Sequence, residues 1–266
     1  SAASGSVTVA FFTLFGFIFL MTQYFQFVRG YGPLSTGVHL LPVALSVGAG
    51  SVAGTQLAVR VGTKLIVTLG LIAMAAFYGW VAAVTTVGIS YGIISVQMVL
   101  YGLGMGLTSA PATESIMGAV SRRQAGVGSA VNDTTRLLGG TLGVAVIGSV
   151  YASLYGSRLT ATLPAGLPRG LAAVAHQSVG AAYTVAGQVP GTLGQVVRTA
   201  ATNAFIHGLS IGCLVAGGVA AAGAVMAVLF LPAQPASVAV TTPSPSRPAT
   251  SAAGTAGTPG KDTAHA

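Results

Sequence analysis

Six long apolar segments constrain this chain more than any other feature of its sequence. A helix that crosses a bilayer needs about 20 mostly apolar residues, and six segments reach that length. They cover approximately residues 7–28, 37–58, 65–84, 89–110, 130–155 and 203–231. Strands of a membrane barrel are a poor alternative, because they are about 10 residues long with alternating polar positions. The sequence therefore predicts an all-α integral membrane protein built as a six-helix transmembrane bundle over residues 1–231.

Charged residues are too scarce to cover a soluble protein of this size. The 266 residues include 11 Lys or Arg and 3 Asp or Glu, which is 5%, whereas soluble domains average about 25%. The net charge of +8 reflects the shortage of acids, and the cations are scattered rather than clustered as in a nucleic-acid-binding surface. We therefore expect the lipid bilayer as a partner and no nucleic acid. The single Cys213 and the isolated histidines predict no metal site.

Two other segments differ in character from the apolar stretches. Residues 156–202 contain three prolines and are predicted to form a long loop on the outer side. Residues 232–266 are rich in Pro, Thr, Ser and Ala. Such a composition cannot bury enough apolar surface to fold, so we predict a disordered cytoplasmic tail.

The orientation follows from Lys and Arg in the short loops, which favour the cytoplasmic side. If the first segment starts inside, the inner loops hold Arg60, Lys64, Arg122 and Arg123, and the short outer loops hold only Arg29. This count predicts a multi-pass protein of the cell membrane with both chain ends in the cytoplasm.

Small residues recur four positions apart in several segments, which favours close helix packing in lipid. The sets are Ser46, Gly50, Gly54 and Ala58; Gly102, Gly106 and Ala110; Gly139 and Gly143 with Ala145, Ser149 and Ser153; and Gly208, Gly212, Ala216, Ala220 and Ala224. We expect these faces to point inward in a compact bundle.

Ionisable groups near a membrane span are functional candidates. Asp133 and Arg136 are spaced i,i+3 and can pair on one helix face, with Asn132 on nearly the same face. Residues 137–155 are long enough to span, so these three residues are expected at the inner mouth. Two roles stay open for them, an ion pair that serves packing, and gating or coupling between two halves. A direct proton-carrying role is disfavoured, because a carboxylate beside Arg resists protonation.

Glu114 is the only other acid near a span, and it follows Pro111 at the inner end of the fourth segment. The plainer interpretation is a solvated loop carboxylate paired with Arg122 or Arg123, and the alternative is a part in gating.

Amide and phenol side chains mark two of the segments. Gln23 and Gln26 are spaced i,i+3 near the outer end of the first segment, with Tyr24 between them, and Gln97 and Tyr101 are spaced i,i+4 in the fourth. Amides with aromatic neighbours suit a cavity for an amphipathic organic substrate. Hydrogen bonding between helices explains them equally well.

The sequence resembles the major facilitator superfamily at several stretches. These are FLMTQYFQFVRGYGPLSTGVHLLPVALSVGAG, LAVRVGTKLIVTLGL and YGLGMGLTSAPATESIMGAVSRRQAGVGSAVNDTTRLLGGTLGVAVIGSV. More narrowly, they are similar to the fourteen-span drug:proton antiporters of the EmrB/QacA type, at the last six spans. The LAVRVGTK stretch resembles the cytoplasmic loop motif of the superfamily, retaining Arg60, Gly62 and Lys64, with Val59 in place of its acid.

This resemblance implies proton-driven export of drugs or other amphipathic organic compounds by two rocking bundles around a midplane site. It implies no cofactor beyond the proton gradient. Gln23, Gln26 and Gln97 would face the central cavity, and Asn132, Asp133 and Arg136 would form a cytoplasmic-side signature. No Asp or Glu lies at the middle of the six segments. We therefore expect a fragment that needs a complementary N-terminal bundle, in cis or in trans.

Two other functions compete with export. The six segments could form a non-transporting scaffold that binds a membrane partner. An intramembrane enzyme is the least favoured, because the sequence shows no nucleophile elbow, phosphate loop or paired catalytic carboxylates.

Overall fold

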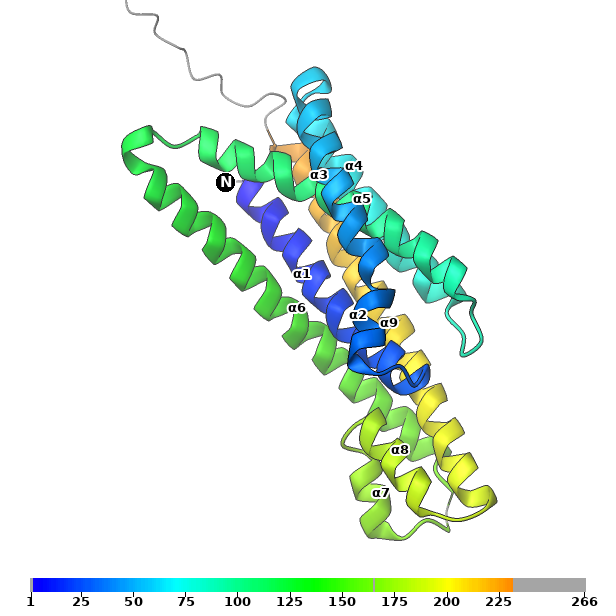
Figure 1. Cartoon of the computed structure of the whole chain (residues 1–266). Coiled ribbons are helices and arrows are strands. Elements are labelled where there is room, and N and C mark those ends of the chain that lie inside the picture. Colours follow the sequence, from blue (N-terminus) through cyan, green and yellow to red (C-terminus); the bar gives the residue numbers. More distant parts are fainter. Residues whose placement is uncertain (1, 165, 232–266) are drawn as a thin grey trace, which may run out of the picture.

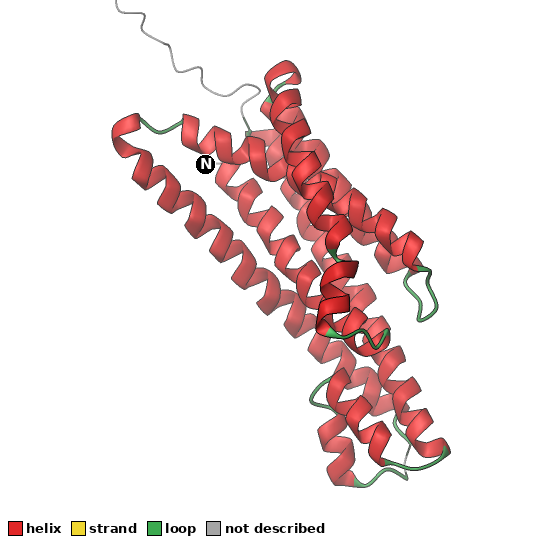
Figure 2. Cartoon of the chain, in the orientation of Figure 1, coloured by secondary structure: helices red, strands yellow, loops and turns green. Residues whose placement is uncertain are grey.

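The computed structural model describes residues 2–164 and 166–231, and its regular elements within these ranges are all helical (Figure 2). The elements are α1 (Ala2–Gln23), the π-helical turn η1 (Tyr24–Val28), α2 (Pro33–His39), α3 (Leu41–Val61), α4 (Thr63–Val84), α5 (Tyr91–Gly118), the short 3-10 turn η2 (Arg122–Gln124), α6 (Ala125–Thr162), α7 (Arg169–Ala175), α8 (Val179–Gln188) and α9 (Thr192–Phe230). The predicted tail, residues 232–266, lies outside the described residues.

Within the described residues 2–164 and 166–231, six helical stretches are long and apolar enough to cross a bilayer. They are Ala2–Val28, Pro33–Val61, Thr63–Val84, Tyr91–Gly118, Ala125–Thr162 and Thr192–Phe230. The prediction of an all-α membrane bundle with six spanning helices is therefore confirmed.

The stretch expected to be a long loop, residues 156–202, is instead mostly helical. α6 continues to Thr162, α7 and α8 follow, and α9 already begins at Thr192. The hydropathy of the sequence located only the helical segments that lipid would cover. The additional helical turns within residues 156–202 are stabilised by packing on one another. Val185 of α8 and Val197 of α9 are both buried, and α8 packs against α9.

The helices pack in a layered bundle whose two ends differ (Figure 1). α3 packs on α5, α1 on α6, and α4 on both α5 and α9. α9 also contacts α1 and α6, so α1, α4, α5 and α9 form the middle while α3 and α6 lie at two edges. We call the end where α5 passes into α6 the α5–α6 end. The opposite end carries α7 and α8 and is called the α7–α8 end.

Small residues allow the helix backbones to approach closely, as the spacing predicted. A Cβ added at Gly50 of α3 would lie 2.7 Å from the carbonyl oxygen of Leu103 of α5. A Cβ at Gly143 of α6 would collide with the carbonyl oxygen of Phe12 of α1. The stripe on α9 is buried throughout. On α6 the residues Ala145, Ser149 and Ser153 are exposed, so that second stripe does not serve packing in this bundle.

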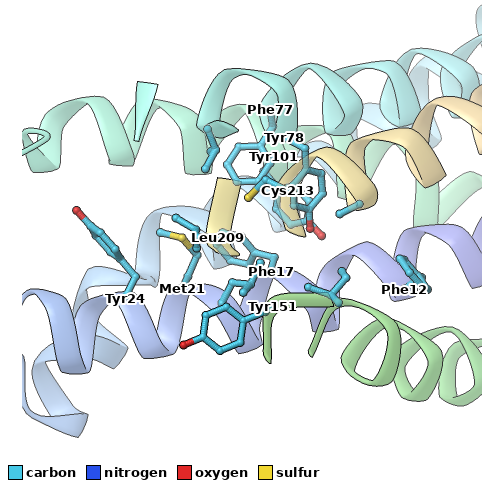
Figure 3. Packing of buried hydrophobic residues seen from close by; sticks show 14 of the residues in the cluster. Phe12, Phe17, Met21, Tyr24, Phe77, Tyr78, Tyr101, Tyr151, Leu209 and Cys213 are labelled. Atoms are coloured by element: carbon cyan, nitrogen blue, oxygen red, sulfur yellow. The ribbon is translucent and has the colours of Figure 1, made fainter. Parts of the chain in front are cut away.

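Aromatic side chains fill the middle of the bundle (Figure 3). Phe17 of α1 stacks on Tyr101 of α5 with ring centroids 4.8 Å apart, and Phe77 of α4 lies 4.8 Å from the same ring. The hydroxyl of Tyr78 donates to the carbonyl oxygen of Thr13 at 2.6 Å. This cluster ties α1, α4 and α5 together between the two ends of the bundle.

Candidate functional site

A polar bridge joins α5, α6 and α1 at the α5–α6 end. Arg136 Nη2 donates to Thr113 Oγ1 at 3.2 Å, and Thr113 Oγ1 donates to Asn132 Oδ1 at 3.4 Å. The Arg136 guanidinium carbon also lies 5.0 Å from the ring centroid of Phe11. We call Phe11, Thr113, Asn132 and Arg136 the polar bridge. α5 and α6 otherwise contact each other weakly, so these side chains form much of what connects the two helices.

The polar bridge leaves hydrogen-bonding capacity unused. Asn132 is buried, Arg136 is partly buried, and the Nε atom of Arg136 is covered without a hydrogen-bond partner in the described part of the chain. A cation placed among apolar helices is costly unless its donors are satisfied. The bridge can therefore accept a further hydrogen-bond acceptor or anionic group at Arg136.

Asp133 and Arg136 do not pair, so the expected ion pair is wrong. The Asp133 side chain is exposed, and Arg136 instead turns toward Thr113 and Phe11. The i,i+3 spacing permits contact on an isolated helix, but the Arg136 side chain contacts Thr113 of α5 and Phe11 of α1 instead. Asn132 and Arg136, spaced i,i+4, are the pair that shares a buried site.

Glu114 lies within α5 rather than in a loop, which corrects the expected end of that helix. α5 continues through Pro111 to Gly118, because Ala112 and Ile116 on its far turns are buried against the bundle. Glu114 itself is exposed, and the described side chains give it no ion pair with Arg123. The side chain of Arg122 lies outside what the structure describes.

The loop-motif residues Arg60, Gly62 and Lys64 meet at the tight connection between α3 and α4. Gly62 alone separates the two helices and has a φ of 95°, which glycine adopts without strain. Arg60 is exposed and Lys64 is partly buried. These residues lie at the same end of the bundle as the polar bridge, and no described contact joins the two.

Two of the predicted cavity residues meet in the interior, Tyr24 and Gln97. They line a small cavity of about 10 Å³ together with residues of α4 and α9, which is room for about one water molecule. Gln97 is 2% exposed and its Nε2 atom has no partner. The Tyr24 hydroxyl accepts a hydrogen bond from Arg29 Nε at 3.1 Å.

The remaining predicted cavity residues lie apart from Tyr24 and Gln97 in the part of the chain that the structure describes. Gln23 lines a separate cleft at the α7–α8 end, and Tyr101 belongs to the aromatic cluster, where its hydroxyl donates to Thr13 Oγ1 at 3.4 Å. Gln26 lies in the π-helical turn η1. In such a wider i→i+5 turn, residues spaced i,i+3 no longer share a face as closely as they do in an α-helix.

Three participants in these sites were missed by the sequence reasoning. Thr113 and Phe11 complete the polar bridge, and Arg29 orients Tyr24. Thr113 and Phe11 lie on helices remote in sequence from Arg136, so no local spacing signals their contact. Among the described residues, no group of three or more His, Cys, Asp or Glu side chains could hold a metal ion.

Comparison with known proteins gives one family for this arrangement. The family model described as Major Facilitator Superfamily matches residues 3–144, which include α1 to α5 and the part of α6 that carries Asn132 and Arg136.

Several curated proteins are similar along most of the chain. The methyl viologen resistance protein SmvA of Salmonella typhimurium (strain LT2) is 34% identical over 210 residues, which is 78% of this chain and 41% of that protein. The tetracenomycin C resistance and export protein of Streptomyces glaucescens is 30% identical over 244 residues, or 88% of this chain and 44% of that protein. The multidrug resistance protein Stp of Mycobacterium tuberculosis is 33% identical over 150 residues, 56% of this chain and 28% of that protein.

The chain thus spans less than half the length of these relatives. The family model nevertheless covers more than half of the chain, and the six spanning helices agree with it. This multi-pass membrane protein belongs to the Major Facilitator Superfamily.

Proposed function

We propose that the chain forms one helical bundle of a membrane exporter of drugs or other amphipathic organic compounds. The observation that carries the proposal is the similarity, over 78% and 88% of the chain, to proteins named for methyl viologen resistance and for tetracenomycin C export. Those names describe the relatives, and the shared helices extend the same activity class to this chain. A transporter rather than an enzyme is the function that this family favours.

The polar bridge supports a role in conformational coupling. Alternating access is largely the rocking or gating of one bundle against the other, and a helix at the edge of a bundle with few contacts to its neighbour can adjust during that movement. Thr113, Asn132 and Arg136 connect α5 and α6 through two hydrogen bonds rather than broad apolar packing. We assign Asn132 and Arg136, with Thr113, the role of a separable contact at the cytoplasmic side. Asp133 and Glu114, both exposed at this end, have no partner in that contact.

Proton entry is the proposed driving force, and the principal proton carriers are expected in a second bundle. The acids that the structure describes, Glu114 and Asp133, are exposed at the α5–α6 end rather than at the middle of a helix. The large apolar side chains exposed on α3 and α6, such as Val59 and Leu137, offer surfaces that such a bundle would cover. We propose this second bundle as the missing partner, with the cell membrane as location and both chain ends in the cytoplasm.

Drug accumulation in an efflux-deficient bacterial host tests the export function. One strain expresses the complete reading frame that contains this sequence, a second expresses residues 1–266 alone, and a third carries an empty vector. We expect methyl viologen and ethidium to accumulate less only in the first strain, and we expect an uncoupler to abolish the difference. Equal accumulation in the first and third strains would overturn the export proposal, and export by residues 1–266 alone would overturn the need for a second bundle.

A membrane scaffold remains the second candidate function, because Gln23 and Gln97 lie in separate sites instead of one cavity. If the chain is a scaffold, drug accumulation should be the same in all three strains. A stable membrane partner should then copurify with the chain. The same host strains therefore separate the two functions.

A further inference from the structure

A cleft at the α7–α8 end is distinct from both the polar bridge and the small interior cavity. It has a volume of about 540 Å³ and lies between α1, α6 and the turn that joins α7 to α8. Its lining includes Phe19, Gln23, Tyr151, Tyr155, His176 and Gln177. The volume falls within the range of about 300–1,000 Å³ that is typical of small-molecule sites.

One wall of the cleft is a rigid aromatic surface. Tyr151 and Tyr155 stack on each other with ring centroids 5.8 Å apart and planes inclined by 26°. Phe19 of α1 meets Tyr151 edge-on at 6.1 Å, and Phe205 of α9 supports Tyr151 from behind at 5.4 Å. A wall of this kind favours flat aromatic ligands, because ring faces and edges can pack against it in preferred geometries.

The hydroxyl of Tyr151 is the unsatisfied polar group of this wall. Tyr151 is 5% exposed, and its hydroxyl oxygen is covered and has no hydrogen-bond partner among the residues that the structure describes. Figure 3 shows that hydroxyl pointing away from Phe77, Tyr78 and Tyr101, toward the end of α1 that carries Tyr24. The neighbouring Tyr155 is already satisfied, because it donates to the carbonyl oxygen of Ala175 at 3.1 Å. A buried hydroxyl without a partner is unfavourable, and a ligand in the cleft that carries oxygen would satisfy it.

The charge of the lining decides the class of ligand. None of the residues that line the cleft is Asp, Glu, Lys or Arg. The polar groups present are the amides of Gln23 and Gln177, the His176 ring and hydroxyls. A localised cation or anion would enter this cleft without a counter-charge, whereas hydroxyl and carbonyl groups would find donors and acceptors.

We propose that the cleft binds planar, uncharged polycyclic aromatic compounds that carry hydroxyl or carbonyl groups, with Tyr151 as a hydrogen-bonding residue. The proposal deepens the export function and rests on it, because a ligand held at this end would be cargo. The binding itself is a property of the folded bundle and needs no gradient.

Equilibrium binding to the purified protein in lipid nanodiscs tests the proposal. The probe is quinizarin, an uncharged planar dihydroxyanthraquinone whose fluorescence reports its environment, and methyl viologen is the comparison compound. We expect saturable quinizarin binding that Tyr151→Phe weakens about fivefold, the equivalent of one ordinary hydrogen bond. Ala152→Phe, which fills the cleft from an exposed lining position, should abolish it. Tyr183→Phe is the matched control, because its hydroxyl contacts Thr202 outside the cleft, and it should bind quinizarin like the unmodified protein.

Tyr151→Phe is expected to fold, because its hydroxyl has no partner to lose, and thermal unfolding in detergent checks this. Absent quinizarin binding, or binding that both Tyr151→Phe and Ala152→Phe leave unchanged, would overturn the cleft as a ligand site. Methyl viologen binding as tightly as quinizarin would overturn the ligand class. If drugs are exported in cells but both cleft variants bind quinizarin normally, the cleft is refuted and the export function is not. If quinizarin binds but no drug is exported, the export function is refuted and the cleft is not.

Discussion

The two ends of the bundle use the same helix, α6, in different ways. At the α5–α6 end, α6 presents Asn132 and Arg136, which reach α5 through hydrogen bonds and α1 through a cation–aromatic contact. At the α7–α8 end, it presents Tyr151 and Tyr155, whose rings pack on each other and on α9. The first connection is narrow and polar, and the second is broad and aromatic.

This difference assigns different physical tasks to the two ends. Two hydrogen bonds can be exchanged for water or another polar partner at low cost, so the α5–α6 end suits a contact that opens and closes. Buried aromatic contacts are lost only with exposure of a large apolar area, so the α7–α8 end suits a fixed binding wall. The substitutions predicted below disturb one end of the bundle, both ends or neither end.

The largest effect is expected at the middle of α6, where the helix backbone approaches α1 closely. A Cβ at Gly143 would collide with the carbonyl oxygen of Phe12, which cannot move without shifting α1. We expect Gly143→Ala to lower the free energy of unfolding by about 3 kcal/mol, as overpacking against backbone does. Thermal unfolding in detergent measures the change.

Gly148→Ala on the same helix is the matched control. There the added Cβ would lie 3.6 Å from the ring of Phe19, an ordinary contact distance. Similar unfolding of the two variants would contradict the close approach of α1 and α6 at Gly143.

A smaller effect is expected from the polar bridge, and it should be confined to the α5–α6 end. Thr113→Val removes the hydroxyl that accepts from Arg136 and donates to Asn132. Leaving buried polar groups without a partner costs about 2 kcal/mol, so we expect a lower unfolding temperature and at least tenfold weaker export. Drug accumulation in cells and thermal unfolding measure the two effects.

Thr134→Val controls for the loss of a hydroxyl, because Thr134 is exposed and donates only within its own helix, to Ala130. Quinizarin binding at the other end should stay unchanged in both variants. A loss of that binding in Thr113→Val would show that the two ends are not independent.

At the α7–α8 end, Tyr155→Phe should loosen α7 without altering the polar bridge. The variant loses the hydrogen bond to the carbonyl oxygen of Ala175, worth about 1 kcal/mol. Hydrogen exchange of the α7 amides, followed by mass spectrometry, should become faster. Tyr151→Phe supplies the contrast, because its hydroxyl has no partner, and equal acceleration in both variants would contradict the assignment of the α7 contact to Tyr155.

The sequence was sufficient for the features that depend on local pattern. Apolar length predicted the six spanning helices, and the spacing of Gly50, Gly54, Gly102 and Gly106 predicted close helix packing, which the structure places between α3 and α5. These features follow from requirements that lipid imposes on each segment separately.

The sequence was insufficient where tertiary contacts decide the structure. The outer turns of α9 pack against α8, and Tyr155 of α6 donates a hydrogen bond to Ala175 of α7, and no hydropathy pattern reports such contacts. Thr113 became a site residue only because α5 brings it to Arg136. The π-helical turn η1 rearranged the face that Gln23 and Gln26 were expected to share.

The smallest effect is expected at Asp133, which tests how far spacing alone can be trusted. Its neighbour Arg136 contacts Thr113 of α5 and Phe11 of α1, while Asp133 is exposed and has no partner among the described residues. Asp133→Asn therefore removes no internal contact, and an exposed substitution of this kind should change export by less than about twofold. Arg136→Gln, measured in the same drug-accumulation assay, should reduce export as strongly as Thr113→Val. If Asp133→Asn abolished export while unfolding stayed normal, Asp133 would have to act on a group outside this bundle, and the polar bridge would not be the coupling contact by itself.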